Sequence, residues 1–162
     1  DFPYYATNFG INRLNMEKKK IAVTYRLNKE IYDSCIFGEY CYATTTEGVL
    51  SARTDSNLLD RDKWTSYNVS IPEVEGDIRY IGTFQSTLCF FQKGRGVYYQ
   101  NERGGEYNRL HRYDYMFWVK MENDKLILML VNSTVVFTSL GHFVTLNTGD
   151  VYDLSQLKEN VF

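Results

Sequence analysis

The segment LCFFQKGRGV (88–97) is an apolar run, a polar turn and a second run that opens with a small residue and a valine. The same order occurs at YATNFGI (5–11) and YATTTEGV (42–49), and a weaker copy, LMLVNSTV, covers 128–135. Small residues open the second run of each copy at intervals of 38, 48 and 38 residues: Gly10, Gly48, Gly96 and Thr134. A repeat of roughly 40–50 residues is typical of propeller blades with four strands each.

Short strands separated by turns account for most of the rest of the chain. Apolar and β-branched runs between Gly, Asn and Asp turn signals predict strands at 21–25, 39–44, 48–53, 78–82, 87–91, 96–100, 115–120, 125–131, 135–139 and 142–146. Residues 12–20 and 155–162 are the candidates for short helices.

Composition points the same way. The chain has 162 residues, of which 44% are hydrophobic and 16% aromatic, which suits one domain with a sizeable core and favours strands. A net charge of −2 argues against a dedicated nucleic-acid binder. No apolar run approaches the roughly 18 residues that a membrane-spanning helix needs. Three cysteines do not form a disulfide framework and are expected to be small buried residues.

We therefore expect an all-β fold: antiparallel four-stranded blades of a partial β-propeller. A β-sandwich or barrel with accidental spacing is the alternative. The repeats predict one β-repeat domain over 1–162, with a partial blade at 1–30 and blades at about 31–76, 77–112 and 113–156. Because the sequence opens in mid-repeat and without Met, we expect it to be a fragment of a larger propeller.

A second pattern recurs in QNERGGEY (100–107) and TLNTGDVY (145–152), with a looser copy that ends at Trp64. It resembles a degenerate Asp-box of the sialidase-type (BNR) β-propellers, in which this box is the hairpin between the third and fourth strands of a blade. The resemblance implies a turn whose acid or amide caps backbone N–H groups, whose glycine takes a positive φ and whose aromatic packs between blades. The implied turn residues are Trp64, Glu102, Gly104, Tyr107, Asn147, Gly149 and Tyr152.

This chain departs from that family in several places. Glu102 and Asn147 stand where the box has Asp, tyrosine twice replaces its tryptophan, and the Trp64 copy has no glycine. The family's N-terminal Arg-Ile-Pro signature is missing, so no catalytic residue is assigned from the resemblance.

Metal and cofactor chemistry find little support in the sequence. The two histidines, His111 and His142, have no ligand spacing around them, and we expect neither a metal nor a cofactor. The acidic loop at 55–62 lacks the alternating oxygen ligands and the glycine of a calcium loop. The glycine pairs near residues 95 and 104 precede no helix and are interpreted as hairpin turns rather than phosphate loops.

Arginines and tyrosines alternate in one stretch, a pattern found on surfaces that bind proteins, sugars or single-stranded nucleic acid. If they share one exposed face, they form an interaction face: Arg95, Tyr98, Tyr99, Arg103, Arg109 and Arg112. The expected partners are other protein subunits or the remainder of a longer chain. A glycan is the second option, and nucleic acid is disfavoured by the net charge.

We accordingly expect a non-catalytic structural or protein-interaction module in a virion, phage-tail or secreted assembly, located outside the cell or on a virion. The alternative is a carbohydrate-binding or sialidase-like glycoside hydrolase propeller. Fold alone does not decide between them.

Overall fold

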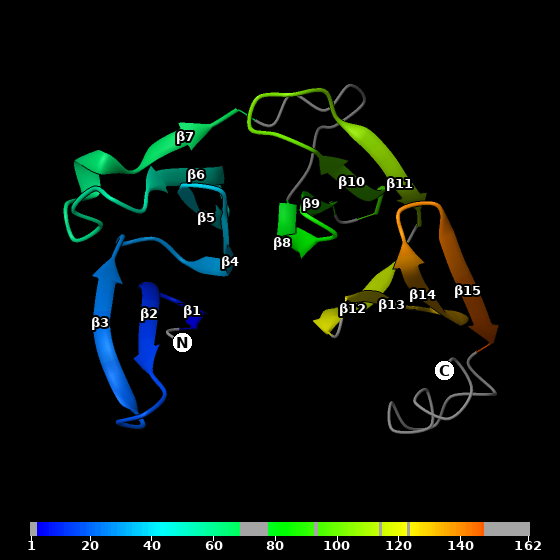
Figure 1. The fold of residues 1–162 in the computed structure, drawn as a ribbon, viewed down its shortest axis with the longest axis horizontal. Helices are drawn as coiled ribbons and strands as arrows, with labels where there is room; N and C mark the ends of the chain where they lie inside the picture. The colour runs from blue at the N-terminus through cyan, green and yellow to red at the C-terminus, as the bar shows by residue number, and fades with distance from the viewer. Residues whose placement is uncertain (1–2, 69–77, 93, 114, 123, 148–162) are drawn as a thin grey trace.

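The computed structural model describes residues 3–68, 78–92, 94–113, 115–122 and 124–147. These residues form four antiparallel sheets that follow one another along an arc (Figure 1). In every sheet, neighbours along the chain are neighbours in the sheet. The link between β6 and β7 contains a single turn of 3-10 helix, η1 (Arg61–Lys63).

The first sheet has three strands, and each of the others has four. The first sheet contains β1 (Tyr4–Thr7), β2 (Gly10–Asn15) and β3 (Lys20–Arg26). The second contains β4 (Ile31–Phe37), β5 (Tyr40–Thr45), β6 (Gly48–Arg53) and β7 (Thr65–Tyr67). The third contains β8 (Ile78–Phe84), β9 (Thr87–Gln92), β10 (Gly96–Gln100) and β11 (Asn108–Arg112). The fourth contains β12 (Met116–Glu122), β13 (Lys125–Leu130), β14 (Ser133–Ser139) and β15 (His142–Asn147).

Separate hydrophobic cores lie between successive sheets. Alternate residues of one strand pack into two different cores, because successive side chains in a strand point to opposite faces of the sheet. In β9, Leu88 and Phe90 belong to the core shared with the second sheet, whereas Cys89 and Phe91 belong to the core shared with the fourth. Radial stacking of four-stranded meanders is the architecture of a β-propeller. The all-β propeller prediction is confirmed, and the β-sandwich alternative is wrong.

The first repeat pattern corresponds to a fixed position in the blade. Gly48 and Gly96 each begin the third strand of a four-stranded blade, β6 and β10. Gly10 begins β2, which takes the same position in the first sheet, where the three strands correspond to the second, third and fourth strands of a blade. At Gly10 and Gly96 a Cβ would lie 2.0 Å and 2.2 Å from a backbone carbonyl oxygen of the adjacent outer strand. The close approach of that strand therefore requires glycine at both positions.

Each inner strand also carries a β-bulge at its second residue. The register shifts between Ile31 and Asp33 in β4, between Ile78 and Tyr80 in β8, and between Met116 and Trp118 in β12. A bulge inserts one unpaired residue and turns its side chain away from the regular alternation. In β4 and β8 these residues are Tyr32 and Arg79, and they come together across two blades.

The helix predicted at 12–20 is wrong. The segment is the end of β2, a turn and the start of β3. Two features favour the turn: Lys19 has a φ of +47°, and the Asn15 Oδ1 accepts a hydrogen bond from the Lys18 backbone N–H (2.9 Å). An asparagine that bonds to nearby backbone in this way competes with helix formation. The other helix candidate, 155–162, lies outside the described residues.

Candidate functional site

A cavity of about 750 Å³ opens at the junction of the third and fourth sheets. Successive strands of a meander run in opposite directions, so the start of β8, the β9–β10 turn and the β11–β12 link lie on one face of the arc. Residues from all three places, and from the adjoining ends of β9 and β12, line the cavity: Arg79, Tyr80, Phe91, Gly94, Tyr113, Tyr115 and Met116. Its volume is in the range of small-molecule binding sites.

Arg79 supplies the only charged side chain among the described lining residues. It is the bulged residue of β8, and its guanidinium carbon lies 4.0 Å from the ring centroid of Tyr32 in the second sheet. A cation at this distance is attracted to the ring face. The bulge and the stacking together hold the guanidinium at the cavity, on the side of the second blade.

The aromatic walls differ in exposure. Tyr115, in the β11–β12 link, is 73% exposed. Tyr113 is buried, and its hydroxyl has no hydrogen-bond partner among the described residues. Burial raises the pKa of Tyr113, so the hydroxyl remains a neutral donor. The described lining is therefore mainly aromatic, with one arginine and one buried tyrosine hydroxyl.

Asp33 joins the inner strands of the second and third blades beside this region. Its two carboxylate oxygens accept hydrogen bonds from the backbone N–H groups of Ser34 (2.8 Å) and Ile81 (3.1 Å). Burial raises the pKa of Asp33 to about 6, and these two hydrogen bonds oppose the rise. The Thr44 hydroxyl bridges the same strands through the backbone oxygens of Asp33 and Arg79. These contacts fix the position of β8, and with it that of Arg79.

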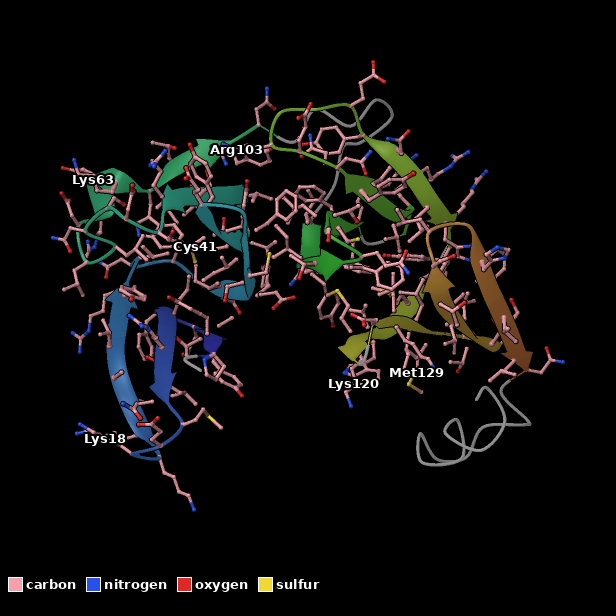
Figure 2. All side chains as sticks on the ribbon, in the orientation of Figure 1. Lys18, Cys41, Lys63, Arg103, Lys120 and Met129 are labelled. Carbon is pink, nitrogen blue, oxygen red and sulfur yellow. The ribbon has the colours of Figure 1, made fainter. Side chains whose placement is uncertain are left out.

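Arg103 makes a second inter-blade contact, on the opposite face. It projects from the β10–β11 connection toward β6 and β7 (Figure 2). Its guanidinium carbon lies 3.8 Å from the Tyr40 ring centroid and 4.6 Å from that of Tyr67. The guanidinium also donates to the Tyr42 hydroxyl (2.9 Å) and to the Ser51 hydroxyl (3.1 Å). Arg103 therefore links the third blade to the second.

The turn that carries Arg103 is held by Tyr67 and Gln100. The Tyr67 hydroxyl donates to the Gln100 Oε1 (2.8 Å) and accepts from the Gly104 N–H (3.0 Å). The Gln100 side-chain amide donates to the Gly105 carbonyl oxygen (2.6 Å). Gly104 has a φ of +76°, a conformation that favours glycine. Tyr67 and Gln100 thus make the hydrogen bonds to the turn backbone that the box pattern assigns to the Glu102 side chain.

The box-like copies do not all occupy one blade position. Trp64 and Tyr107 each lie directly before the fourth strand of a blade, β7 and β11. Asn147, in contrast, is the last residue of a fourth strand, β15. The remaining residues of that copy, Gly149 and Tyr152, lie outside the described residues.

The arginines and tyrosines predicted as one interaction face are not brought together on one exposed surface. Tyr98 is buried, and Tyr99 packs against the core between the third and fourth sheets. Arg103 stacks between blades. All four arginines are nevertheless exposed: Arg95 in the β9–β10 turn, Arg103 in the β10–β11 connection, and Arg109 and Arg112 in β11.

The cysteines are free and sit in or beside the cores. Cys41 and Cys89 are buried, and Cys41 lies between the first two sheets (Figure 2). Burial raises the pKa of the Cys41 thiol to about 12 and that of Cys89 to about 11, which makes both poor nucleophiles.

The described residues contain neither a metal-binding cluster nor a membrane-spanning helix. No group of three or more His, Cys, Asp or Glu side chains is placed to hold a metal ion within them. No helix in the same part of the chain is long and apolar enough to cross a membrane.

The fold, the meander order and the glycine register define a β-propeller, and the comparisons with known proteins agree. A family model for the N-terminal β-propeller domain of PorZ (TSS9) matches residues 1–65. The structure is similar to that of PorZ from Porphyromonas gingivalis, with a TM-score of 0.78 and 17% sequence identity over 92% of this chain. PorZ is described as an essential bacterial surface component of the type IX secretion system. The present chain covers 20% of it.

Two further similar structures are of YCF48. One, bound to a D1 peptide, has a TM-score of 0.60 and 10% identity, covering 91% of this chain and 52% of that one. The other, from Cyanidioschyzon merolae, has a TM-score of 0.60 and 9% identity, covering 89% and 51%. Identities this low show a shared fold only. A comparison with curated proteins found no match.

The cavity was not foreseen from the sequence. Its lining residues are spread from 79 to 116, on three different strands and the connections beside them, and Arg79 reaches it from the bulged position of β8. The one local signal was the aromatic-rich link itself, with tyrosines at 113 and 115 flanking an acidic residue.

Proposed function

We propose that this chain is part of a larger β-propeller that acts as a non-catalytic interaction module in a protein assembly on the bacterial surface. The observation that carries the proposal is the similarity of 92% of the chain to one fifth of PorZ, together with the family match at 1–65. A secretion-system surface assembly is the setting that these matches favour. Neither a virion, a phage tail nor a glycan finds support among them.

The geometry of the sheets supports the same organisation. The first sheet has three strands where the others have four, and β1 has only β2 as a hydrogen-bonded neighbour among the described residues. The first and last sheets lie at opposite ends of an open arc (Figure 1). We propose that residues 1–30 are the outer part of one blade and that 31–76, 77–112 and 113–156 are the next three.

We propose that the connections between the third and fourth strands are degenerate Asp-box turns. Trp64 and Tyr107 support this, because both precede a fourth strand and pack in or against an inter-blade core. Trp64 also donates from its indole nitrogen to the Leu58 carbonyl oxygen (3.1 Å), which closes the loop before β7.

A non-catalytic role is supported by what the polar groups do. Arg103, Gln100 and Asp33 each join one blade to another or close a turn. Such contacts give a rigid scaffold that presents its loops and edges to partners.

Cross-linking of the native assembly tests this function. The protein would be purified from its own host under mild conditions and treated with a lysine-reactive cross-linker, since Lys18 and Lys63 are exposed. We expect cross-links from these lysines to peptides of other subunits or of other blades. A protein that purifies as a lone 19.0 kDa species and turns over a glycoside would contradict the proposal and favour the hydrolase alternative.

A further inference from the structure

We propose that the face of the first sheet turned away from the second sheet is the seam of the propeller, where another sheet of the same polypeptide packs through hydrogen bonds to Asn12. This inference rests on the proposed function, because it takes the chain to be part of a larger propeller. It adds the face that closes the ring and the chemistry of the sheet that covers it.

The seam face lies at one end of the arc (Figure 1). Tyr5 pairs with Asn12 across β1 and β2, and the Asn12 side chain is hydrogen-bonded to that of Thr24 in β3, so these three residues share one face. Leu14 follows on the same face two residues after Asn12, and Ile21 of β3 is its partner. These five residues make up the seam face, and the opposite face of the sheet packs against the second sheet.

In the other three sheets the corresponding face packs against the preceding sheet. The pair that takes the place of Tyr5 and Asn12 in each of them is apolar or aromatic: Ala43 and Leu50, Phe90 and Tyr98, Leu128 and Val135. The first residue of each of these pairs is 0% exposed, whereas Tyr5 is 52% exposed. Because blades that follow one another around a closed ring cover each other's faces, we expect the seam face to be covered in the complete propeller.

The centre of the seam face is polar, and this sets the chemistry of the sheet that covers it. The Thr24 hydroxyl donates a hydrogen bond to the Asn12 Oδ1 (2.8 Å). The NH2 group of the same amide carries two further donors. Buried donors need acceptors, so the covering sheet is expected to place a hydrogen-bond acceptor opposite Asn12. The cores between the other sheets are apolar at this point.

The end of the seam face next to the β2–β3 turn is apolar. Leu14 is half-buried, and its partner Ile21 is 53% exposed. The covering sheet is therefore expected to have an apolar side chain against this pair and its acceptor nearer the centre.

Hydroxyl-radical footprinting of the intact protein in its native assembly tests the inference without any substitution. Tyr5 and Phe9 both react through aromatic rings, and their exposures are comparable, at 52% and 46%. Phe9 lies in the β1–β2 turn, outside the seam face, and is the matched control. We expect Tyr5 to be oxidised about fivefold less than Phe9, because a side chain inside an interface loses most of its exposed surface. Equal oxidation of the two rings would overturn the inference.

The same measurement on the full-length polypeptide, after dissociation from its partners, identifies what covers the face. Protection of Tyr5 that persists in the isolated polypeptide supports a sheet of the same chain. Protection that is lost on dissociation means that a partner subunit covers the face; this result overturns the inference and leaves the interaction function intact.

Substitutions at Asn12 test the hydrogen bonds. Asn12→Leu combined with Thr24→Val makes the centre of the face apolar, as it is in the second sheet. We expect this double variant to raise the oxidation of Tyr5 toward that of Phe9, because the acceptor on the covering sheet loses its donor. Asn12→Gln keeps the amide donors and should preserve part of the protection, and a constant Phe9 signal shows that the first sheet is folded in both variants. Full protection of Tyr5 in the apolar variant would show that packing alone holds the seam, and would overturn the inference.

Discussion

Replacing Gly96 or Gly10 with alanine tests the blade register directly. The new Cβ of Gly96→Ala would lie 2.2 Å from the His111 carbonyl oxygen, whereas real Cβ atoms essentially never approach within 3.0 Å. β10 and β11 must therefore separate by about 0.8 Å, and overpacking of this kind costs about 1–3 kcal/mol. Alanine also restricts the unfolded chain, which raises the free energy of unfolding by about 0.4–1 kcal/mol. The net expectation is a loss of about 1–2 kcal/mol in the free energy of unfolding.

Gly10→Ala should lose a similar amount, because its Cβ would lie 2.0 Å from the Tyr25 carbonyl oxygen at the same blade position. The matched control is Gly141→Ala in the β14–β15 turn, where a Cβ meets nothing within 4 Å. Urea unfolding followed by tryptophan fluorescence measures all three. The control should change stability by less than about 0.5 kcal/mol. If Gly96→Ala and Gly10→Ala were as stable as Gly141→Ala, the proposed approach of the outer strands would be refuted.

Three further outcomes follow from named contacts. Because the folded-state pKa of Asp33 is raised from 3.8 to about 6, its contribution to stability is fully present below about pH 4, falls by at most about 3 kcal/mol between about pH 4 and pH 6, and is lost above that. Urea titrations should show Asp33→Asn gaining on the unchanged protein between those pH values, and a constant difference would contradict this. Arg103→Ala should destabilise by about 1–2 kcal/mol through lost stacking and hydrogen bonds, whereas Arg109→Ala, at an exposed arginine of β11, should be near neutral in the same assay; equal effects would remove the inter-blade role. Cys41 and Cys89 should resist iodoacetamide at pH 8 until urea unfolds the chain, as mass spectrometry of the alkylated peptides can show, and fast labelling of the folded protein would place these thiols outside the cores.

The strands that the sequence predicted are those with a strong local signal. Apolar runs next to glycine turns, such as 48–53 and 96–100, coincide with β6 and β10. β4 carries Asp33 and Ser34 in its middle, and these polar residues interrupt the apolar pattern that predicts a strand. The Asp33 carboxylate is tolerated there because it accepts a hydrogen bond from the Ile81 N–H of another blade. β11, an outer strand with exposed arginines, needs no apolar alternation. Both were missed for the same reason: what stabilises them lies in other strands.

The candidate site follows the same logic. A sequence pattern identifies arginines but not their contacts, so it did not show that Arg103, although exposed, stacks on tyrosines of the preceding blade. Arg79, which lines the cavity, had no local signal, because a one-residue bulge sets its direction. Pairings between distant strands create both environments.

An experimental structure of the protein in its native assembly tests the central claim most directly. If the chain is part of a larger propeller, a fourth strand will pair with the edge of β1 that has no partner among the described residues, and further sheets will continue the arc beyond β12–β15. A ring closed by these four sheets alone, or a β1 edge left unpaired in the intact assembly, would contradict the account.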